Sequence, residues 1–153
     1  MTNHPFFAAH THGFVRVGAC TPVATVGDTI ANADAAIALA KQGDEAGADL
    51  LVFPELNLSS YAIDDLHLQD ALCDASEAAL ARVAEASEKL SPALLMGVAL
   101  RRNGRLYNCA VAISRGQILG VVPKSHLPNY REYYEKRWFA PGAGLTGLEI
   151  EVA

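Results

Sequence analysis

Segments with strand-like runs of hydrophobic residues alternate along this chain with segments that carry hydrophobic residues at helical spacing. Together they predict a mixed α/β fold. Short runs dominated by apolar side chains predict five strands, over Phe14–Cys20, Ala48–Phe53, Ala93–Leu100, Leu106–Ser114 and Ile118–Val122. The second and third of these runs are almost entirely apolar, which is typical of strands buried on both faces.

Two longer stretches between the strands carry apolar residues at helical spacing. The first begins after Asp28, a plausible N-cap, and ends before Gly47. The second covers Asp65–Leu90, with a possible break near Cys73–Ser76. The residues expected to face the core are Ile30, Ala33, Ile37 and Ala40 in the first helix and Leu80, Val83, Ala84 and Leu90 in the second.

The last three predicted strands are joined by tight turns. Asn103 and Gly104 form a strong two-residue hairpin signal, and Arg115 with Gly116 turns the chain back again. Strand–helix–strand–helix–strand followed by such a meander predicts an α/β sheet covered by helices, with some antiparallel pairing. Leu148–Val152 alternates apolar and polar residues and predicts the start of a further strand.

Composition narrows the class of protein. The chain has 153 residues, 51% of them hydrophobic, so it can bury a sizeable core and is not disordered. Its net charge of −5 provides no basic field for nucleic acid. Cys20, Cys73 and Cys109 form no CxxC pair and predict neither a disulfide framework nor a metal site. With no signal-like start and no membrane-length apolar run, we expect a cytoplasmic protein.

Glu55 and Lys124 are the strongest candidates for catalytic residues. Each directly follows a proline at the end of an apolar strand. Since ligands gather beyond the carboxyl ends of strands in open α/β sheets, the two side chains could face each other across a pocket. The carboxylate would act as general base and the ammonium would stabilise charge on a carbonyl oxygen. The alternative is two solvated charges at loop starts.

A third candidate, Glu135, lies in a segment rich in tyrosine and charge that ends at Phe139. Surrounded by aromatic rings, this carboxylate could be partly desolvated and tuned for proton transfer. Alternatively it pairs with Arg131 or Arg137 on a surface turn. A nucleic-acid platform of basic and aromatic residues is a weaker interpretation in so acidic a chain.

At this point the residues resemble the nitrilase superfamily of carbon–nitrogen hydrolases, and most closely the glutaminase domain of glutamine-dependent NAD synthetases. The resemblance covers nearly the whole chain from Gly13 onward. The motifs that carry it, in order, are Phe53–Leu56, Leu58–Tyr61, Asp64–Leu68, Tyr107-Asn108, Val122–Tyr130 and Lys124–Gly142.

The resemblance implies an α-β-β-α sandwich that hydrolyses carbon–nitrogen bonds with a Glu-Lys-Cys triad. By this similarity Glu55 is the general base, Lys124 stabilises the tetrahedral intermediate, and Glu135 is the supporting second glutamate. Tyr61 and Tyr130 match tyrosines that line the glutamine pocket.

Two departures from the family pattern stand out. Ser60 replaces the glycine usual before the tyrosine, which puts the fit of Tyr61 in doubt. The family's nucleophilic cysteine follows the lysine, whereas here Cys109 is the last cysteine and precedes Lys124. We therefore expect a tail over residues 1–12 and an incomplete sandwich over residues 13–153 that ends before the nucleophile strand and is inactive alone.

The expected function is that of the N-terminal part of a glutaminase domain that supplies ammonia for amidation of deamido-NAD. Glutamine is the expected substrate, and the expected partners are a missing C-terminal synthetase domain and further copies of the protein. No cofactor or metal is expected in this segment, whereas ATP and magnesium belong to the synthetase domain. The alternatives are a fragment of another amidase or carbamoylase, and a naturally short non-catalytic binding or assembly protein.

Overall fold

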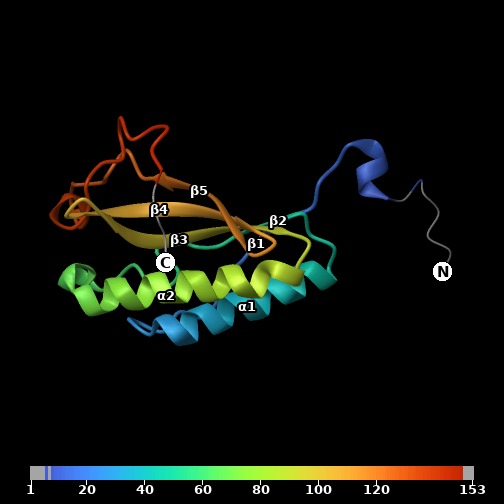
Figure 1. Cartoon of the computed structure of the whole chain (residues 1–153), viewed down its shortest axis with the longest axis horizontal. Coiled ribbons are helices and arrows are strands. Elements are labelled where there is room, and N and C mark those ends of the chain that lie inside the picture. Colours follow the sequence, from blue (N-terminus) through green and yellow to red (C-terminus); the bar gives the residue numbers. More distant parts are fainter. Residues whose placement is uncertain (1–5, 7, 150–153) are drawn as a thin grey trace.

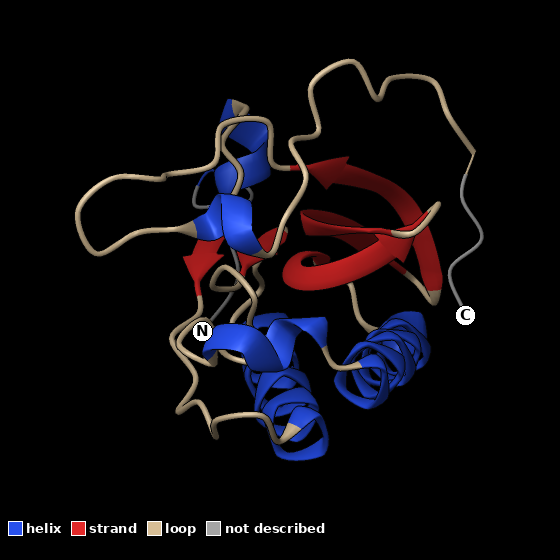
Figure 2. Cartoon of the chain, turned by 90° about the vertical axis from the view of Figure 1, so that its left-hand side faces the viewer, coloured by secondary structure: helices blue, strands red, loops and turns tan. Residues whose placement is uncertain are grey.

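The computed structural model describes residue 6 and residues 8–149, and it shows one five-stranded sheet with two long helices on one face (Figures 1 and 2). The strands are β1 (Val17–Ala19), β2 (Leu50–Val52), β3 (Ala93–Arg102), β4 (Arg105–Ser114) and β5 (Gln117–Pro123). The helices are α1 (Thr29–Glu45) and α2 (Asp70–Ala86), with short 3-10 turns at Ala9–His12, Asp64–Leu68, Ser87–Lys89 and Glu135–Arg137. The architecture is one α/β half of the predicted sandwich.

The strands lie in chain order, β1-β2-β3-β4-β5. The first three run parallel, β4 is antiparallel to β3, and β5 is antiparallel to β4 and so runs in the direction of the first three. Asn103 and Gly104 join β3 to β4 with φ values of 48° and 70°, as a type I′ turn requires. Arg115 and Gly116 join β4 to β5 with φ values of 49° and 80°. Both predicted hairpins are confirmed.

The core lies between the sheet and the two helices. Leu80 and Val83 of α2 are buried, as predicted, against the apolar side chains of β3 and β4. Helix α1 buries a narrow face of small residues, Ala33, Ala36 and Ala40. Ile30 is 67% exposed, so its predicted core position is wrong. It lies in the first turn, about 60° around the helix from Ala33, to one side of this face.

The first two strands are shorter and more open than predicted. Only Val17–Ala19 of the first run and Leu50–Val52 of the second pair with a neighbour. Val52 is 38% exposed because it lies on the face of the sheet opposite the two long helices, α1 and α2, so burial of the second strand on both faces is wrong. Phe14, at 67% exposed, lies before the paired part of β1.

The predicted second helix is divided, but not where its sequence indicated. Helix α2 runs unbroken through Cys73–Ser76, where the Ser76 hydroxyl donates to the Leu72 carbonyl within the helix. The break falls at Gln69, whose extended backbone (φ −79°, ψ 122°) separates the 3-10 turn Asp64–Leu68 from α2.

The strand predicted over Leu148–Val152 falls largely outside the described residues, and Leu148 and Glu149 themselves are not in a strand. Among the helices of the described residues, none is both long and apolar enough to cross a membrane.

Candidate active site

The strand ends that carry Glu55 and Lys124 meet at one edge of the sheet. Strands β2 and β5 run in the same direction, since two antiparallel steps separate β5 from β3. Their carboxyl ends therefore lie together, with β3 and β4 between them. At Gly97 of β3 an added Cβ would lie 2.3 Å from the Pro54 carbonyl oxygen and 2.8 Å from Glu55 Cα. The missing side chain lets the Glu55 segment cross directly over the sheet.

Glu55, Lys124 and Glu135 form one contact cluster. Lys124 Nζ lies 2.6 Å from Glu55 Oε1 and 3.0 Å from Glu135 Oε1. The solvated-charges alternative for Glu55 and Lys124 is therefore wrong. So is pairing of Glu135 with a surface arginine, because Arg137 instead binds Asp65 with two 2.6 Å hydrogen bonds.

Two further side chains orient the carboxylates of this cluster. Asn108 on β4 donates from Nδ2 to Glu55 Oε1 at 2.5 Å, and its backbone oxygen accepts from the Lys124 amide at 2.7 Å. The Tyr61 hydroxyl donates to Glu135 Oε1 at 2.6 Å. Lys124 is thus fixed through both its backbone and its ammonium.

Burial differs sharply across the cluster. The Glu135 side chain is 1% exposed, that of Lys124 29% and that of Glu55 44%. Glu135 Oε2 has no hydrogen-bond partner among the described residues. A buried carboxylate beside an ammonium suits a structural anchor, whereas the more open Glu55 is placed to exchange a proton with a bound molecule.

The environment also shifts two proton affinities. Burial lowers the pKa of Lys124, but hydrogen bonds and charges from Glu55 and Glu135 outweigh it and hold the pKa above its ordinary value. Burial raises the pKa of Tyr61, and the hydrogen bond to Glu135 raises it further. At neutral pH Lys124 is therefore a cation and Tyr61 a hydrogen-bond donor.

A hollow of about 360 Å³ adjoins the pair on the open face of the sheet. Glu55 and Lys124 line one end of it, and its floor is made of small and apolar strand residues, Val52, Leu95, Gly97, Ala110 and Val122. The hollow has room for a small substrate or a packed chain segment. A molecule bound there would lie beside the Glu55 carboxylate and the Lys124 ammonium.

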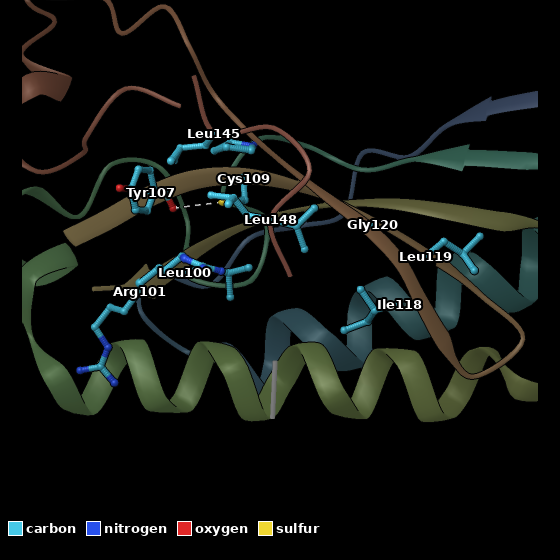
Figure 3. A pocket seen from close by; sticks show the side chains of 12 residues that line it. Leu100, Arg101, Tyr107, Cys109, Ile118, Leu119, Gly120, Leu145 and Leu148 are labelled. Carbon is cyan, nitrogen blue, oxygen red and sulfur yellow. Dashed lines mark hydrogen bonds between the residues drawn. The ribbon is translucent and has the colours of Figure 1, made fainter. Parts of the chain in front are cut away.

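A second hollow, of about 380 Å³, lies elsewhere on the sheet (Figure 3). Leu100, Tyr107, Cys109, Leu145 and Leu148 are among its lining, and neither Glu55 nor Lys124 is. Burial raises the pKa of Cys109 to about 12, and its thiol donates to the Tyr107 carbonyl oxygen. Cys109 therefore stays a protonated thiol and does not serve as the nucleophile.

Tyr130 is the predicted site residue that the structure does not bring into the cluster. It is 64% exposed, and its ring packs against Tyr133 with centroids 6.1 Å apart. The hydrogen bonds of the described residues that hold Glu55, Lys124 and Glu135 do not include its hydroxyl. Its predicted role in the glutamine pocket stays a prediction.

Sequence reasoning gave no role to Asn108 and Gly97. Asn108 was visible only as part of a resemblance motif, and a polar side chain inside an apolar strand was the signal that could have marked it. Gly97 looked like an ordinary strand residue, although an isolated glycine in a strand often marks close approach of another backbone.

Ser60, the departure before Tyr61, adopts a left-handed backbone with φ 75°. Glycine takes this conformation without steric cost, which relieves about 1–2 kcal/mol. Ser60→Gly also removes a long hydrogen bond, from the Ser60 hydroxyl to the Thr25 carbonyl oxygen at 3.4 Å, so we expect a net stabilisation of about 1 kcal/mol or less. Urea unfolding of the 153-residue protein measures it. Ser59→Gly is the control and should destabilise the chain, because Ser59 has no positive φ and glycine there adds flexibility and removes the hydroxyl that donates to the Ser60 carbonyl oxygen at 3.3 Å. A destabilised Ser60→Gly variant would contradict this account.

The raised pKa values of Lys124 and Tyr61 predict a loss of stability at alkaline pH. The folded chain holds both protons more tightly than the unfolded chain, whose groups titrate near their ordinary values of 10.0 for tyrosine and 10.5 for lysine. The unfolded state therefore releases protons first, and the unfolding free energy falls as pH rises above 10.0. Urea unfolding across this range should show a shallower fall in Tyr61→Phe. A fall in Tyr61→Phe as steep as that of the wild type would contradict the assignment.

Comparison with known proteins places this geometry in a family. The sequence profile of the carbon-nitrogen hydrolase family matches residues 15–153. The chain belongs to the carbon-nitrogen hydrolase family. It is 53% identical over 142 residues to a glutamine-dependent NAD(+) synthetase of Mycobacterium tuberculosis, covering 93% of this chain and 21% of that protein. A Thermotoga maritima protein of the same name is 36% identical over 126 residues, 82% of this chain and 22% of the relative.

The fold of the chain is also found in solved structures. The glutamine-dependent NAD+ synthetase of Acinetobacter baumannii superposes with a TM-score of 0.78 at 32% identity, covering 84% of this chain and 24% of that one. A Nesterenkonia amidase from the nitrilase superfamily has a TM-score of 0.70 at 24% identity, covering 84% and 48%, and shows the shared fold. The chain spans about a fifth of the length of the curated relatives it matches.

Proposed function

We propose that this chain is part of a glutaminase domain that releases ammonia from glutamine within a glutamine-dependent NAD synthetase. The observation that carries the proposal is the Glu55–Lys124–Glu135 cluster, in a chain 53% identical to proteins of that name. The ammonia would amidate deamido-NAD in a synthetase domain outside these 153 residues.

Glu55 and Lys124 supply the chemistry in this proposal. The Glu55 carboxylate takes the proton of a thiol, whose sulfur attacks the carboxamide carbon of glutamine. Lys124 stabilises the negative oxygen that forms, and Glu55 returns the proton as ammonia leaves. Water, activated by the same carboxylate, then hydrolyses the thioester to glutamate. Glu135 and Asn108 hold Lys124 and Glu55 in place for these steps.

The thiol in this scheme comes from outside the residues in hand. No cysteine follows Lys124 in these 153 residues, and Cys109 is held as a buried thiol. We place residues 1–12 as a tail and 13–153 as the first part of the glutaminase domain, with the nucleophile strand beyond. ATP and magnesium belong to the synthetase domain, and no cofactor is assigned to this segment.

The proposal includes the location of the protein in the cell and its assembly. The three cysteines of the described chain are free, which supports a cytoplasmic location. Assembly into a homo-oligomer is expected of the complete enzyme.

The proposal is tested by extending the chain through its own reading frame and measuring ammonia release from glutamine. The extended chain is expected to be active. Glu55→Gln and Lys124→Met should each lower kcat/KM by about 100-fold or more. Arg82→Met, which breaks an exposed ion pair with Asp34 away from the site, should leave it unchanged. The 153-residue chain alone should release no ammonia.

Each alternative predicts a different result. Turnover of simple amides or N-carbamoyl compounds in preference to glutamine would identify another amidase or carbamoylase. A stop codon directly after Ala153 would favour a non-catalytic protein. Ammonia release by the 153-residue chain would show that the nucleophile has been misplaced.

A further inference from the structure

His67 is a buried histidine within the Asp64–Leu68 motif, and the proposed triad chemistry gives it no role. It lies in the 3-10 turn Asp64–Leu68 and is 2% exposed. Its ring packs against those of Trp138 and Phe139, with centroids 5.3 and 5.0 Å away. These two residues directly follow the turn that carries Glu135.

The hydrogen bonding of the ring defines its protonation state. His67 Nε2 lies 3.2 Å from the Tyr61 carbonyl oxygen. Because a carbonyl oxygen only accepts, the proton is on Nε2, and Nδ1 keeps a lone pair. Nδ1 is buried and has no partner among the described residues, so a second proton there would lack an acceptor. Burial lowers the pKa of His67, in keeping with a neutral ring, although Asp64 and Glu135 oppose the shift.

The two contacts of the ring lead to the same residue, Glu135, one through its carboxylate and one through its backbone. Through Nε2 it holds the backbone of Tyr61, whose hydroxyl donates to Glu135 Oε1. The ring also packs in a T-shaped arrangement against Phe139, whose amide donates to the Glu135 carbonyl oxygen at 2.9 Å. Glu135 Oε1 in turn accepts from Lys124 at 3.0 Å.

We infer that His67 is a positioning residue. Its Nε2–H group fixes the Tyr61 carbonyl oxygen and so holds the Tyr61 hydroxyl and the Glu135 carboxylate in place beside Lys124. The importance of this placement for turnover rests on the proposed function. The placement itself is independent of the proposed function. His67 does not touch the reacting atoms in this arrangement. Nor is it a ligand site: a hollow of about 580 Å³ borders the ring, yet Nδ1 is covered and cannot meet a molecule bound there.

The first test is the tautomer of His67 in the 153-residue protein. Nitrogen-15 NMR at neutral pH is expected to show a neutral ring protonated on Nε2, with the signature of a single tautomer. A neutral ring protonated on Nδ1 would overturn the inference, because Nε2 could then not donate to the Tyr61 carbonyl oxygen.

The second test replaces the ring and follows the titration of the Lys124 ammonium by NMR. His67→Phe keeps an aromatic ring but has no N–H group, whereas His67→Gln keeps an N–H group of similar reach. The Lys124 pKa is expected to fall toward the ordinary 10.5 in His67→Phe and to stay raised in His67→Gln. His67→Met replaces His67→Phe if the latter does not fold. An unchanged Lys124 pKa in the folded variant without an N–H group would overturn the inference.

Controls separate this inference from the proposed function. Glu135→Gln must lower the Lys124 pKa, which shows that the readout responds to the cluster. His12→Gln is a matched control, because His12 also contacts a carbonyl oxygen from a 3-10 turn but is exposed, and it should change nothing. Neither NMR readout needs a nucleophile or glutamine. A chain without glutaminase activity can therefore still support the positioning role, and an active one can still refute it.

Discussion

Replacing Lys124 with methionine is expected to lower the free energy of unfolding by about 3–5 kcal/mol, the usual effect of removing one partner from a buried ion pair. Methionine keeps the apolar stem but leaves the Glu135 carboxylate, which is 1% exposed, without its cation. Tyr61 would remain as its side-chain hydrogen-bond donor. Urea unfolding of the 153-residue protein near neutral pH measures the loss.

Two comparisons make this prediction specific. Arg82→Met breaks an ion pair whose side chains are 47% and 55% exposed, so it should cost about 1 kcal/mol or less. The double variant Lys124→Met/Glu135→Gln removes the stranded charge and should recover part of the stability. If Lys124→Met proved no more damaging than Arg82→Met, the buried pair would not be a stabilising anchor.

Adding one methyl group at Gly97 is expected to cost about 1–3 kcal/mol and to displace Glu55. The new Cβ would lie 2.3 Å from the Pro54 carbonyl oxygen and 2.6 Å from the Leu56 amide nitrogen, both backbone atoms with little freedom to move. The segment that carries Glu55 would have to lift from the sheet. Urea unfolding of Gly97→Ala measures the cost, and NMR of the Lys124 ammonium should show its contact with Glu55 weakened.

Gly120 provides the matched control on the same sheet. It lies in β5, and an added Cβ there meets no atom within 4 Å. Gly120→Ala should therefore leave stability close to the wild-type value and the Lys124 signal unchanged. Equal stability of Gly97→Ala and Gly120→Ala would show that the backbone of the Glu55 segment moves freely.

Much of the site could be predicted because its residues sit at recognisable positions. Glu55 and Lys124 each follow a proline at a strand end, and the direction of the strands then brings them together. Glu135 was harder, since the sequence allowed both a buried carboxylate and a surface pair with Arg137. The outcome depends on Asp65, which is distant in sequence and accepts two hydrogen bonds from Arg137, so that Arg137 does not pair with Glu135.

The burial of several residues could not be predicted from the sequence. His67 sits in a polar turn, and only packing against Trp138 and Phe139 buries it. The open face of β2 could not be foreseen either, because an apolar run looks the same whether one face or both are covered. Ile30 illustrates the same limit: helical spacing identified its side of α1 but not how far the contact with the sheet extends.

The sequence by itself determined the class of fold, the hairpins at Asn103 and Arg115, the two helices and the positions of Glu55 and Lys124 at strand ends. These are local properties, because periodicity, turn residues and strand ends depend on neighbours along the chain. Only the tertiary structure decided that Glu135 joins Lys124 and that Gly97 lets Glu55 cross the sheet. Contacts of this kind join segments far apart in the chain, and they form only when packing brings those segments within a few ångströms.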